Sequence, residues 1–380
     1  MSADSALNVG PFQQAVRFVL EPVNKPLPRF LIVRLGALGD IVHAIPVAAA
    51  LRRAFPGSRI DWLVSAKHRE ILDLVPAIDR RLVIHDRPRS RRGSDGEAHG
   101  GVSLAGAIRE LRKARYDVAI DLQGLIKSAL LARSSGAPRV LGFVSSYARE
   151  ALARPLYTDV HDPGRGGLYD RRETRHVVEI NLGVLSALGI SAAEPEFPIE
   201  AVVSEAARQI QDRTSGRYAL VNPGAAWPNK RWPPARLAAV ATLLRQRHAV
   251  TPVVIWGPGE EALAQEVVAA ARGAALLSPR TTIADLVALT RGATLMVSGD
   301  TGPAHVAAAV GTPIVGIYGP TRPARNGPIS PRDITVSRDA VCRCHHLRRC
   351  TQNRMCLLDV AVEEVADAVE RRLAIELSRV

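Results

Sequence analysis

The stretch FLIVRLGALGDIVHAIPVAAALRRAFPG, residues 30–57, contains a short apolar run, a glycine-containing turn and an Ala-rich segment that ends at Pro56-Gly57. An apolar run of this length that ends at glycine is typical of a buried strand, and the Ala-rich segment has the composition of a helix. The stretch therefore predicts a strand, a turn and a helix, in this order.

Strand-like and helix-like segments alternate along the rest of the chain, on both sides of a break in composition at residues 194–206. Such alternation is typical of parallel α/β sheets. Because their ligands bind at the carboxyl ends of the strands, a cleft between two halves is the expected active site. Before the break we expect strands at 59–64, 81–85 and 116–121 and helices at 67–74 and 104–114; after it we expect strands at 218–222, 253–256, 274–277, 295–298 and 314–318 and a last helix at 360–377.

The length and composition predict a globular protein of two domains. The 380 residues are 47% hydrophobic and 23% charged, and the apolar stretches are shorter than the roughly 18 residues that a membrane span needs. The first residues lack the basic start and apolar core of a signal peptide, so we expect a cytoplasmic protein.

Arginine dominates the charge of the chain. Of the 50 basic residues 5 are Lys and 45 are Arg, and the net charge is +13. The guanidinium fork binds phosphate and carboxylate, which indicates nucleic acid, an anionic membrane surface or a phosphorylated substrate as partner. A GC-rich genome would produce the same excess of Arg. The Arg-rich segments 86–101 and 160–175 fit either solvated loops or loops that capture an anion.

The first motif is the turn GALGD at residues 36–40. Its glycines allow close approach of a ligand, and the helix that follows presents its N-terminus at the same place. Asp40 fits two roles, a cap of that helix or a general base that takes a proton from an acceptor hydroxyl. The three-glycine spacing of dinucleotide-binding turns is absent, which argues against an oxidoreductase.

Two motifs in the second half also follow predicted strands. In the loop at 222–233, Lys230 and Arg231 lie just before a predicted helix, where they are either phosphate ligands or solvated cations. In SGDTGPAH at 298–305, the backbone N–H groups of Thr301 and Gly302 at a helix start would form an anion site, with Asp300 and His305 facing the cleft. A capped helix without a ligand is the alternative.

Several segments, read together and in order, resemble glycosyltransferase family 9, the ADP-heptose:lipopolysaccharide heptosyltransferases. Within that family, residues 61–62, 123–128 and 148–150 are most similar to the heptosyltransferase I branch. The resemblance is carried by residues 31–43, 61–62, 121–128, 148–150, 222–233, 256–261 and 299–305.

The resemblance implies a GT-B fold, with two Rossmann-like domains that face each other across a cleft. It implies an N-terminal extension at 1–28, an acceptor-binding domain at 29–200, a donor-binding domain at 210–358 and, at 359–380, a helix that crosses back toward the first domain. The implied reaction moves heptose from ADP-heptose to a Kdo residue of lipid A with inversion of configuration. It would take place on a peripheral, monomeric protein at the cytoplasmic face of the inner membrane, without nucleic acid as a partner.

The resemblance also implies residue roles. Asp40 would be the catalytic base, and Lys230 would hold the donor phosphate and sugar. Fixed N–H dipoles and Lys230 would stabilise the departing ADP, so no metal or other cofactor is required. The further donor-binding residues would be Glu260 or Glu261 on the ribose, Asp300 on sugar hydroxyls, Thr301, Gly302 and Pro303 around the pyrophosphate, and His305 beside them. The candidate acceptor-binding residues are Gly39, Lys67, Arg69, Lys127 and Arg149; for the four basic ones, a solvated surface charge is the alternative.

Four cysteines lie outside this scheme, Cys342, Cys344, Cys350 and Cys356, with two histidines at 345–346 between them. Clustered Cys and His indicate a zinc site, a disulfide or free thiols, although one residue between the first pair is tighter than zinc sites usually have. All three alternatives stay open from the sequence.

Other functions compete with this interpretation. A GT-B transferase that uses another nucleotide sugar or acceptor, as heptosyltransferase II does, is the nearest alternative. A basic nucleic-acid-binding protein is a remote one, because only 4% of the residues are aromatic and the basic residues are spread over loops.

Overall fold

The computed structural model describes residues 27–85, 104–164, 166–170, 173–191, 194–345 and 347–377. The predicted loop at 86–101 lies outside the described residues. So does the predicted N-terminal extension at 1–28, except for its last two residues. Within them, no helix is long and apolar enough to cross a bilayer.

The first half of the chain forms a parallel sheet of six strands in the order β3-β2-β1-β4-β5-β6. Phe30 of β1 is aligned with Ile60 of β2 on one side and with Val118 of β4 on the other. The strands are β1 (Arg29–Val33), β2 (Arg59–Ser65), β3 (Arg80–Ile84), β4 (Val118–Asp121), β5 (Arg139–Phe143) and β6 (Asp159–His161). The helices are α1 (Leu38–Val42), α2 (Ile45–Ala54), α3 (Leu104–Ala114), α4 (Ile126–Ser134) and α5 (Val177–Gly183), with 3₁₀ helices η1 (Ala66–Leu74), η2 (Ala151–Leu156) and η3 (Val184–Leu188).

The second half repeats this arrangement with the strand order β12-β11-β10-β7-β8-β9, again all parallel. The strands are β7 (Tyr218–Asn222), β8 (Thr251–Val254), β9 (Leu276–Leu277), β10 (Leu295–Gly299), β11 (Ile314–Tyr318) and β12 (Ile334–Ser337). The helices are α6 (Glu205–Thr214), α7 (Pro234–His248), α8 (Glu261–Ala270), α9 (Ile283–Gly292), α10 (Gly302–Ala309), α11 (Pro323–Asn326) and α12 (Val362–Leu377), with η4 (Pro228–Lys230) and η5 (Cys356–Asp359).

Both sheets have the strand order of a Rossmann fold, which confirms the predicted α/β architecture of two Rossmann-like halves. In each sheet the first strand is central, and the chain order reverses beside it, between β1 and β4 and between β7 and β10. Loops at this point leave a crevice at the carboxyl ends of the strands, where ligands of such sheets bind.

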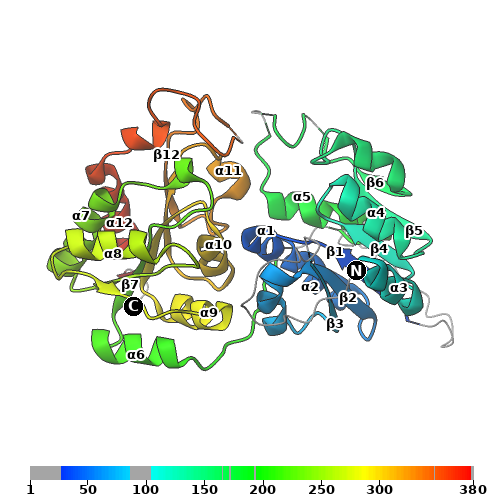
Figure 1. Cartoon of the computed structure of the whole chain (residues 1–380), viewed down its shortest axis with the longest axis horizontal. Helices are drawn as coiled ribbons and strands as arrows, with labels where there is room; N and C mark the ends of the chain where they lie inside the picture. Colours follow the sequence, from blue (N-terminus) through cyan, green and yellow to red (C-terminus); the bar gives the residue numbers. More distant parts are fainter. Residues whose placement is uncertain are drawn as a thin grey trace, which may run out of the picture.

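The halves pack directly on each other in the middle of the molecule (Figure 1). Helix α1 packs against α10, and η1 packs against α9. Val42 of the first half and Val306 of the second belong to one continuous buried cluster. Close approach at this interface depends on Gly39, because a Cβ at that position would overlap the ring of His305.

The last helix does not cross back, so that prediction is wrong. Helix α12 packs against α7, β11 and β12, all in the second half. Its apolar face, which includes Val365 and Val369, is buried in the core of that half. Arg372 is also buried there, with Nε 3.0 Å from Oδ1 of Asp333. An amphipathic helix shows which of its faces is apolar but not which surface will cover it.

Most predicted elements agree with the structure, and the remaining differences are local. Strands β7 and β11 and helix α3 have the predicted bounds, 218–222, 314–318 and 104–114. The segment at 67–74 is part of a 3₁₀ helix. Strand β6 was missed because its three residues are polar or only half-buried. Helix α6 packs on α9, so the second half begins before the predicted residue 210.

Candidate functional site

A cavity of about 720 Å³ lies between the two halves. It is lined by the loops that follow the central strands β1, β4, β7 and β10, as expected for two Rossmann-like halves. Its volume is in the range of small-molecule sites. Of the predicted site residues, Gly39, Asp40, Lys127, Arg149, Lys230, Glu260, Asp300, Thr301, Gly302, Pro303 and His305 line it.

Asp40 lies in the first turn of α1, where its Oδ2 accepts a hydrogen bond of 3.1 Å from the N–H of Ala37. Arg34 Nη2 lies 2.8 Å from Oδ1, and Arg149 Nη2 lies 2.8 Å from Oδ2. Burial acts to raise the pKa of the Asp40 carboxyl, but the charges of Arg34 and Arg149 outweigh it and hold that pKa well below its usual range. Asp40 therefore both caps the helix and stands ionised in the cavity.

Arg34 was missed by the sequence analysis because it lies inside what reads as an apolar strand. The side chain is buried, and its Nη1 donates to the carbonyl of Leu122. Burial lowers the pKa of Arg34 to about 10, so it remains a cation. Arg149 is more exposed, with 30% of its side chain accessible against 4% for Arg34. Arg149 is thus the partner of Asp40 that a bound substrate could engage.

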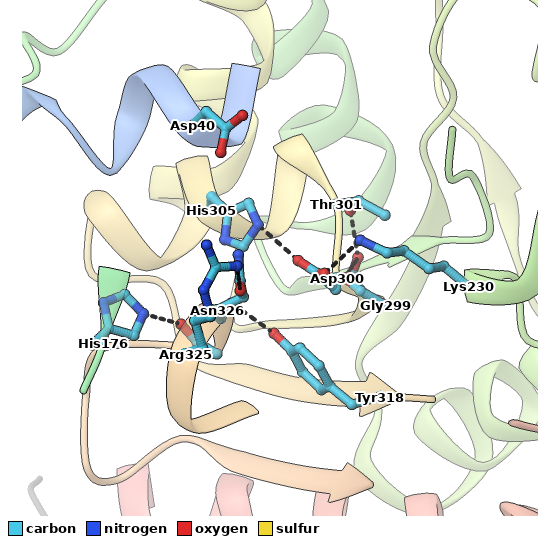
Figure 2. Close-up of polar contacts among 12 residues, drawn as sticks. Asp40, His176, Lys230, Gly299, Asp300, Thr301, His305, Tyr318, Arg325 and Asn326 are labelled. Carbon is cyan, nitrogen blue, oxygen red and sulfur yellow. Dashed lines mark hydrogen bonds and ion pairs between the residues drawn. The ribbon is translucent and has the colours of Figure 1, made fainter. Parts of the chain in front are cut away.

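Three residues of the second half form a charged cluster across the cavity (Figure 2). Lys230 Nζ lies 2.6 Å from Oδ2 of Asp300, and His305 Nε2 lies 3.0 Å from Oδ1. Lys230 also lies over the ring of Trp227, 4.5 Å from its centroid. Burial acts to raise the pKa of Asp300, but Lys230 and His305 hold it well below its usual range. Asp300 is therefore an anion that holds the side chains of Lys230 and His305 in place.

The start of α10 completes the second-half side of the cavity. Thr301 is the residue before the first helical turn, and its Oγ1 accepts a hydrogen bond of 2.8 Å from Nδ2 of Asn222. The first N–H groups of a helix have no acceptor within that helix, and the helix dipole is positive there. This end of α10 can hold an anion such as a phosphate.

The structure distinguishes between the two candidate glutamates. Glu260 lines the cavity, and its Oε2 accepts a hydrogen bond of 3.3 Å from the N–H of Gly257. Gly224 makes room for this carboxylate, because a Cβ there would overlap it. Glu261 lies on the exposed side of α8, where its Oε1 accepts from Gln265 at 3.4 Å. Of the two alternatives, Glu260 is therefore the one that lines the cavity, and Glu261 is not.

Lys67 and Arg69 do not line the cavity, which corrects two of the acceptor predictions. The residue of η1 that lines it is His68, between them. Successive residues of a 3₁₀ helix point about 120° apart, so the neighbours of an inward residue face elsewhere. Gly39 does line the cavity, but its missing side chain serves the contact of α1 with α10.

A stack of three histidines joins the halves beside the cavity and was also missed. The ring of His43 packs edge-on against His305, at 4.3 Å between centroids, and against His176, at 5.3 Å. Burial lowers the pKa of His176 to about 4 and that of His43 well below its usual value. The rings of His43 and His176 are therefore neutral at pH 7. Their positions at 43, 176 and 305 carry no sequence signal, because only packing brings them together.

The cysteines form neighbouring thiols without a disulfide. Cys344 Sγ lies 3.3 Å from Cys350 Sγ, and Cys356 contacts Cys342. In the described part of the chain, which excludes His346, no three Cys, His, Asp or Glu side chains are placed to hold one metal ion. The segment reaches the cavity through Arg348, which lines it. The carbonyl of the neighbouring Leu347 accepts a hydrogen bond of 3.0 Å from Nδ2 of Asn229.

Comparisons with known proteins cover nearly the whole chain. The model of glycosyltransferase family 9 (heptosyltransferase) matches residues 105–355. Lipopolysaccharide heptosyltransferase 1 of Pseudomonas aeruginosa is 29% identical over 327 residues, which are 85% of this chain and 87% of that protein. Lipopolysaccharide heptosyltransferase 1 of Salmonella typhimurium is 29% identical over 300 residues, 79% of this chain and 90% of that protein.

Solved structures share the fold. A glycosyl transferase family 9 protein from Veillonella parvula superposes with a TM-score of 0.71 at 26% identity, over 92% of this chain and 97% of that one. E. coli heptosyltransferase WaaC with ADP superposes with a TM-score of 0.67 at 24% identity, over 93% of this chain and 100% of that one.

Proposed function

The chain belongs to glycosyltransferase family 9, and from this premise we propose that it transfers heptose from ADP-heptose to a Kdo residue of lipid A, with inversion of configuration. It is a glycosyltransferase of the heptosyltransferase type with a GT-B fold. The observation that carries the finer proposal is the position of the ionised Asp40 on one wall of the cavity and of Lys230, Asp300 and the start of α10 on the other.

The second half would bind the donor. Lys230 and the N–H groups at the start of α10 would contact the two phosphates, and Glu260 would accept hydrogen bonds from the ribose. As the bond between the sugar and ADP breaks, negative charge grows on the phosphate oxygen. Cationic and N–H groups that are already in place stabilise that charge without reorganisation. We propose that these groups are sufficient and that catalysis needs no metal.

Asp40 would act as the general base on the acceptor. The acceptor hydroxyl gives its proton to the carboxylate, its oxygen attacks the anomeric carbon from the side opposite ADP, and the bond to ADP breaks. Arg34 and Arg149 make a free Asp40 a weak base, because they stabilise its ionised form. If the acceptor's anionic group draws the more exposed Arg149 to itself, Asp40 loses one stabilising charge and becomes a stronger base when it is needed.

The acceptor would approach from the first half, where Lys127 and Arg149 line the cavity. Lipid A lies in a membrane and carries negative charge, so we propose that the protein acts at the membrane surface. Basic residues near an anionic leaflet each contribute about 1 kcal/mol of attraction. Binding of the purified protein to anionic vesicles, and its loss at high salt, would test this part of the proposal.

The reaction is tested by ADP release from ADP-heptose with Kdo-lipid A, in the wild-type protein and in Asp40→Asn. We expect the variant to lose about 10²–10⁴-fold in kcat, because a general base is removed. Calorimetric binding of ADP should persist, which excludes unfolding as the cause. Full activity of Asp40→Asn would contradict the role of Asp40 as the base, whereas ADP binding without transfer in the wild type would point to another sugar or acceptor.

Treatment with EDTA tests the proposal that catalysis needs no metal. We expect the transferase activity to survive this treatment, and loss of activity would contradict the proposal.

A further inference from the structure

Arg325 is a cation at the cavity to which no role has yet been given. It lies on the short helix α11 of the second half and lines the cavity. Its Nη1 donates to Oδ1 of the neighbouring Asn326 at 2.8 Å. In Figure 2 its guanidinium lies next to His305.

Helix α11 is held in place from two sides. The hydroxyl of Tyr318 donates to the carbonyl of Asn326 at 3.3 Å, and Nε2 of His176 donates to the carbonyl of Gly327 at 3.0 Å. His176 comes from the first half, so the position of α11 is tied to both halves. A side chain on a fixed backbone is preorganised for binding.

Arg325 forms no ion pair with the described residues, and the carboxylates of Asp40 and Asp300 act on it only from a longer distance. Its Nε is buried and has no hydrogen-bond acceptor among the described residues. By contrast, Arg34 and Arg149 both pair with Asp40. Burial and the nearby charge of Arg149 lower the pKa of Arg325. A desolvated cation without a counter-ion is costly, so this part of the cavity favours an anion.

We propose that Arg325 and Arg149 together form an anion subsite that binds the sugar carboxylate of the acceptor next to the hydroxyl that Asp40 deprotonates. The two guanidinium groups come from opposite halves, so one carboxylate would link the halves across the cavity. The fork of an Arg side chain matches a carboxylate with two parallel hydrogen bonds. This inference rests on the proposed function, because it takes the acceptor to be an acidic sugar.

A phosphate of the donor is the other source of anionic oxygens. Lys230 and the start of α10 already offer a phosphate site on the donor side. Arg149 and Asp40 of the first half both act electrostatically on Arg325, and His176 of the first half donates a hydrogen bond to the carbonyl of Gly327, two residues further along. This proximity to the first half favours the acceptor's carboxylate.

The test compares Arg325→Gln and Arg325→Lys with Arg280→Gln, an exposed Arg of the same half that does not line the cavity. Steady-state kinetics would use Kdo-lipid A and the same acceptor with its carboxylate converted to the methyl ester. Free Kdo and ADP would be titrated calorimetrically into each protein, which measures binding without turnover. Thermal unfolding without ligands checks the fold of each variant.

We expect Arg325→Gln to raise KM for Kdo-lipid A by about tenfold or more, since a hydrogen bond to a charged group is lost. KM for ADP-heptose should change less than about twofold, and Arg325→Lys should lie between. The methyl ester should show little difference between wild type and Arg325→Gln. Without ligand the melting temperature should stay or rise, because an unbalanced buried charge is removed.

Two results would overturn the proposal. Weaker ADP binding with unchanged acceptor KM would assign Arg325 to a donor phosphate, and unchanged binding of both would leave no subsite. Failure of the proposed function looks different: the wild type would bind ADP but not transfer heptose to Kdo-lipid A. In that case, binding of free Kdo to wild type and Arg325→Gln still decides whether the subsite exists.

Discussion

When the pH drops from 7 to 5, the His176→Gln variant should lose much less free energy of unfolding than the wild-type protein does. Nε2 of His176 donates to the carbonyl of Gly327, and Nδ1 accepts from the N–H of Val178 at 3.3 Å. Both nitrogens are thus used by the neutral ring. A second proton would have to go on Nδ1, where it would face the Val178 N–H and break that hydrogen bond.

The size of the effect follows from the pKa of His176, which burial lowers from 6.5 to about 4 in the folded protein. Between these values the unfolded chain binds more protons than the folded one, so stability falls as the pH drops. Each pH unit in this window costs about 1.4 kcal/mol, and the step from pH 6.5 to 5 costs about 2 kcal/mol. Asp40 and Asp300 add nothing there, because a carboxyl with a depressed pKa loses its contribution only near pH 4 and below.

The assay is urea denaturation of wild type, His176→Gln and His248→Gln at pH 7, 6 and 5. His248→Gln is a matched control, because it replaces a histidine that lies outside the stack of three histidines. His43, whose pKa is also lowered by burial, remains in all three proteins, so the difference between wild type and His176→Gln isolates His176. If both lose the same free energy of unfolding from pH 7 to pH 5, the argument from the neutral ring is refuted.

Three further predictions concern other parts of the molecule. Gly39→Ala should push α1 away from the ring of His305 and cost about 1–3 kcal/mol of stability; an unchanged melting temperature would contradict this. Lys230→Gln should weaken ADP binding about tenfold or more in calorimetry, because a charge-assisted contact to phosphate is lost, whereas equal affinity would remove Lys230 from the donor site. Hydrogen bonds from Thr351 lower the pKa of Cys344 to about 7, and burial raises that of Cys356 to about 12. In a pH series of alkylation read by peptide mass spectrometry, Cys344 should therefore react at lower pH than Cys356, and the reverse order would count against these thiol environments.

The succession of strands, turns and helices along the chain could be predicted from the sequence. The turn at 36–40 and the motif at 298–305 each follow an apolar strand and start a helix, and both line the cavity in the structure. Strand periodicity, glycine turns and helix starts depend on neighbouring residues, so they can be predicted without knowing the fold. The alternation of these elements also predicts two parallel sheets, because parallel strands need helical crossovers.

The direction in which a side chain points, and the distant residues that it contacts, could be learned only from the tertiary structure. Lys67 and Glu261 lie next to residues that line the cavity but point elsewhere, and a shift of one residue on a helix changes the face completely. Arg34, Arg149 and Asp40 meet only because β1, α1 and the loop after β5 converge at one edge of the first sheet.

The sequence also did not show which surfaces of the chain pack against each other; the tertiary structure determines this. The apolar face of α12 could be identified from its periodicity, but its burial against the second half could not. The same holds for His176 against His43, and for Arg325, whose missing counter-ion is visible only when its surroundings are known. A sequence specifies which groups need partners. Some of the partners, such as His43 for His176 and Arg149 for Asp40, lie more than a hundred residues away, and only the folded chain brings them within reach.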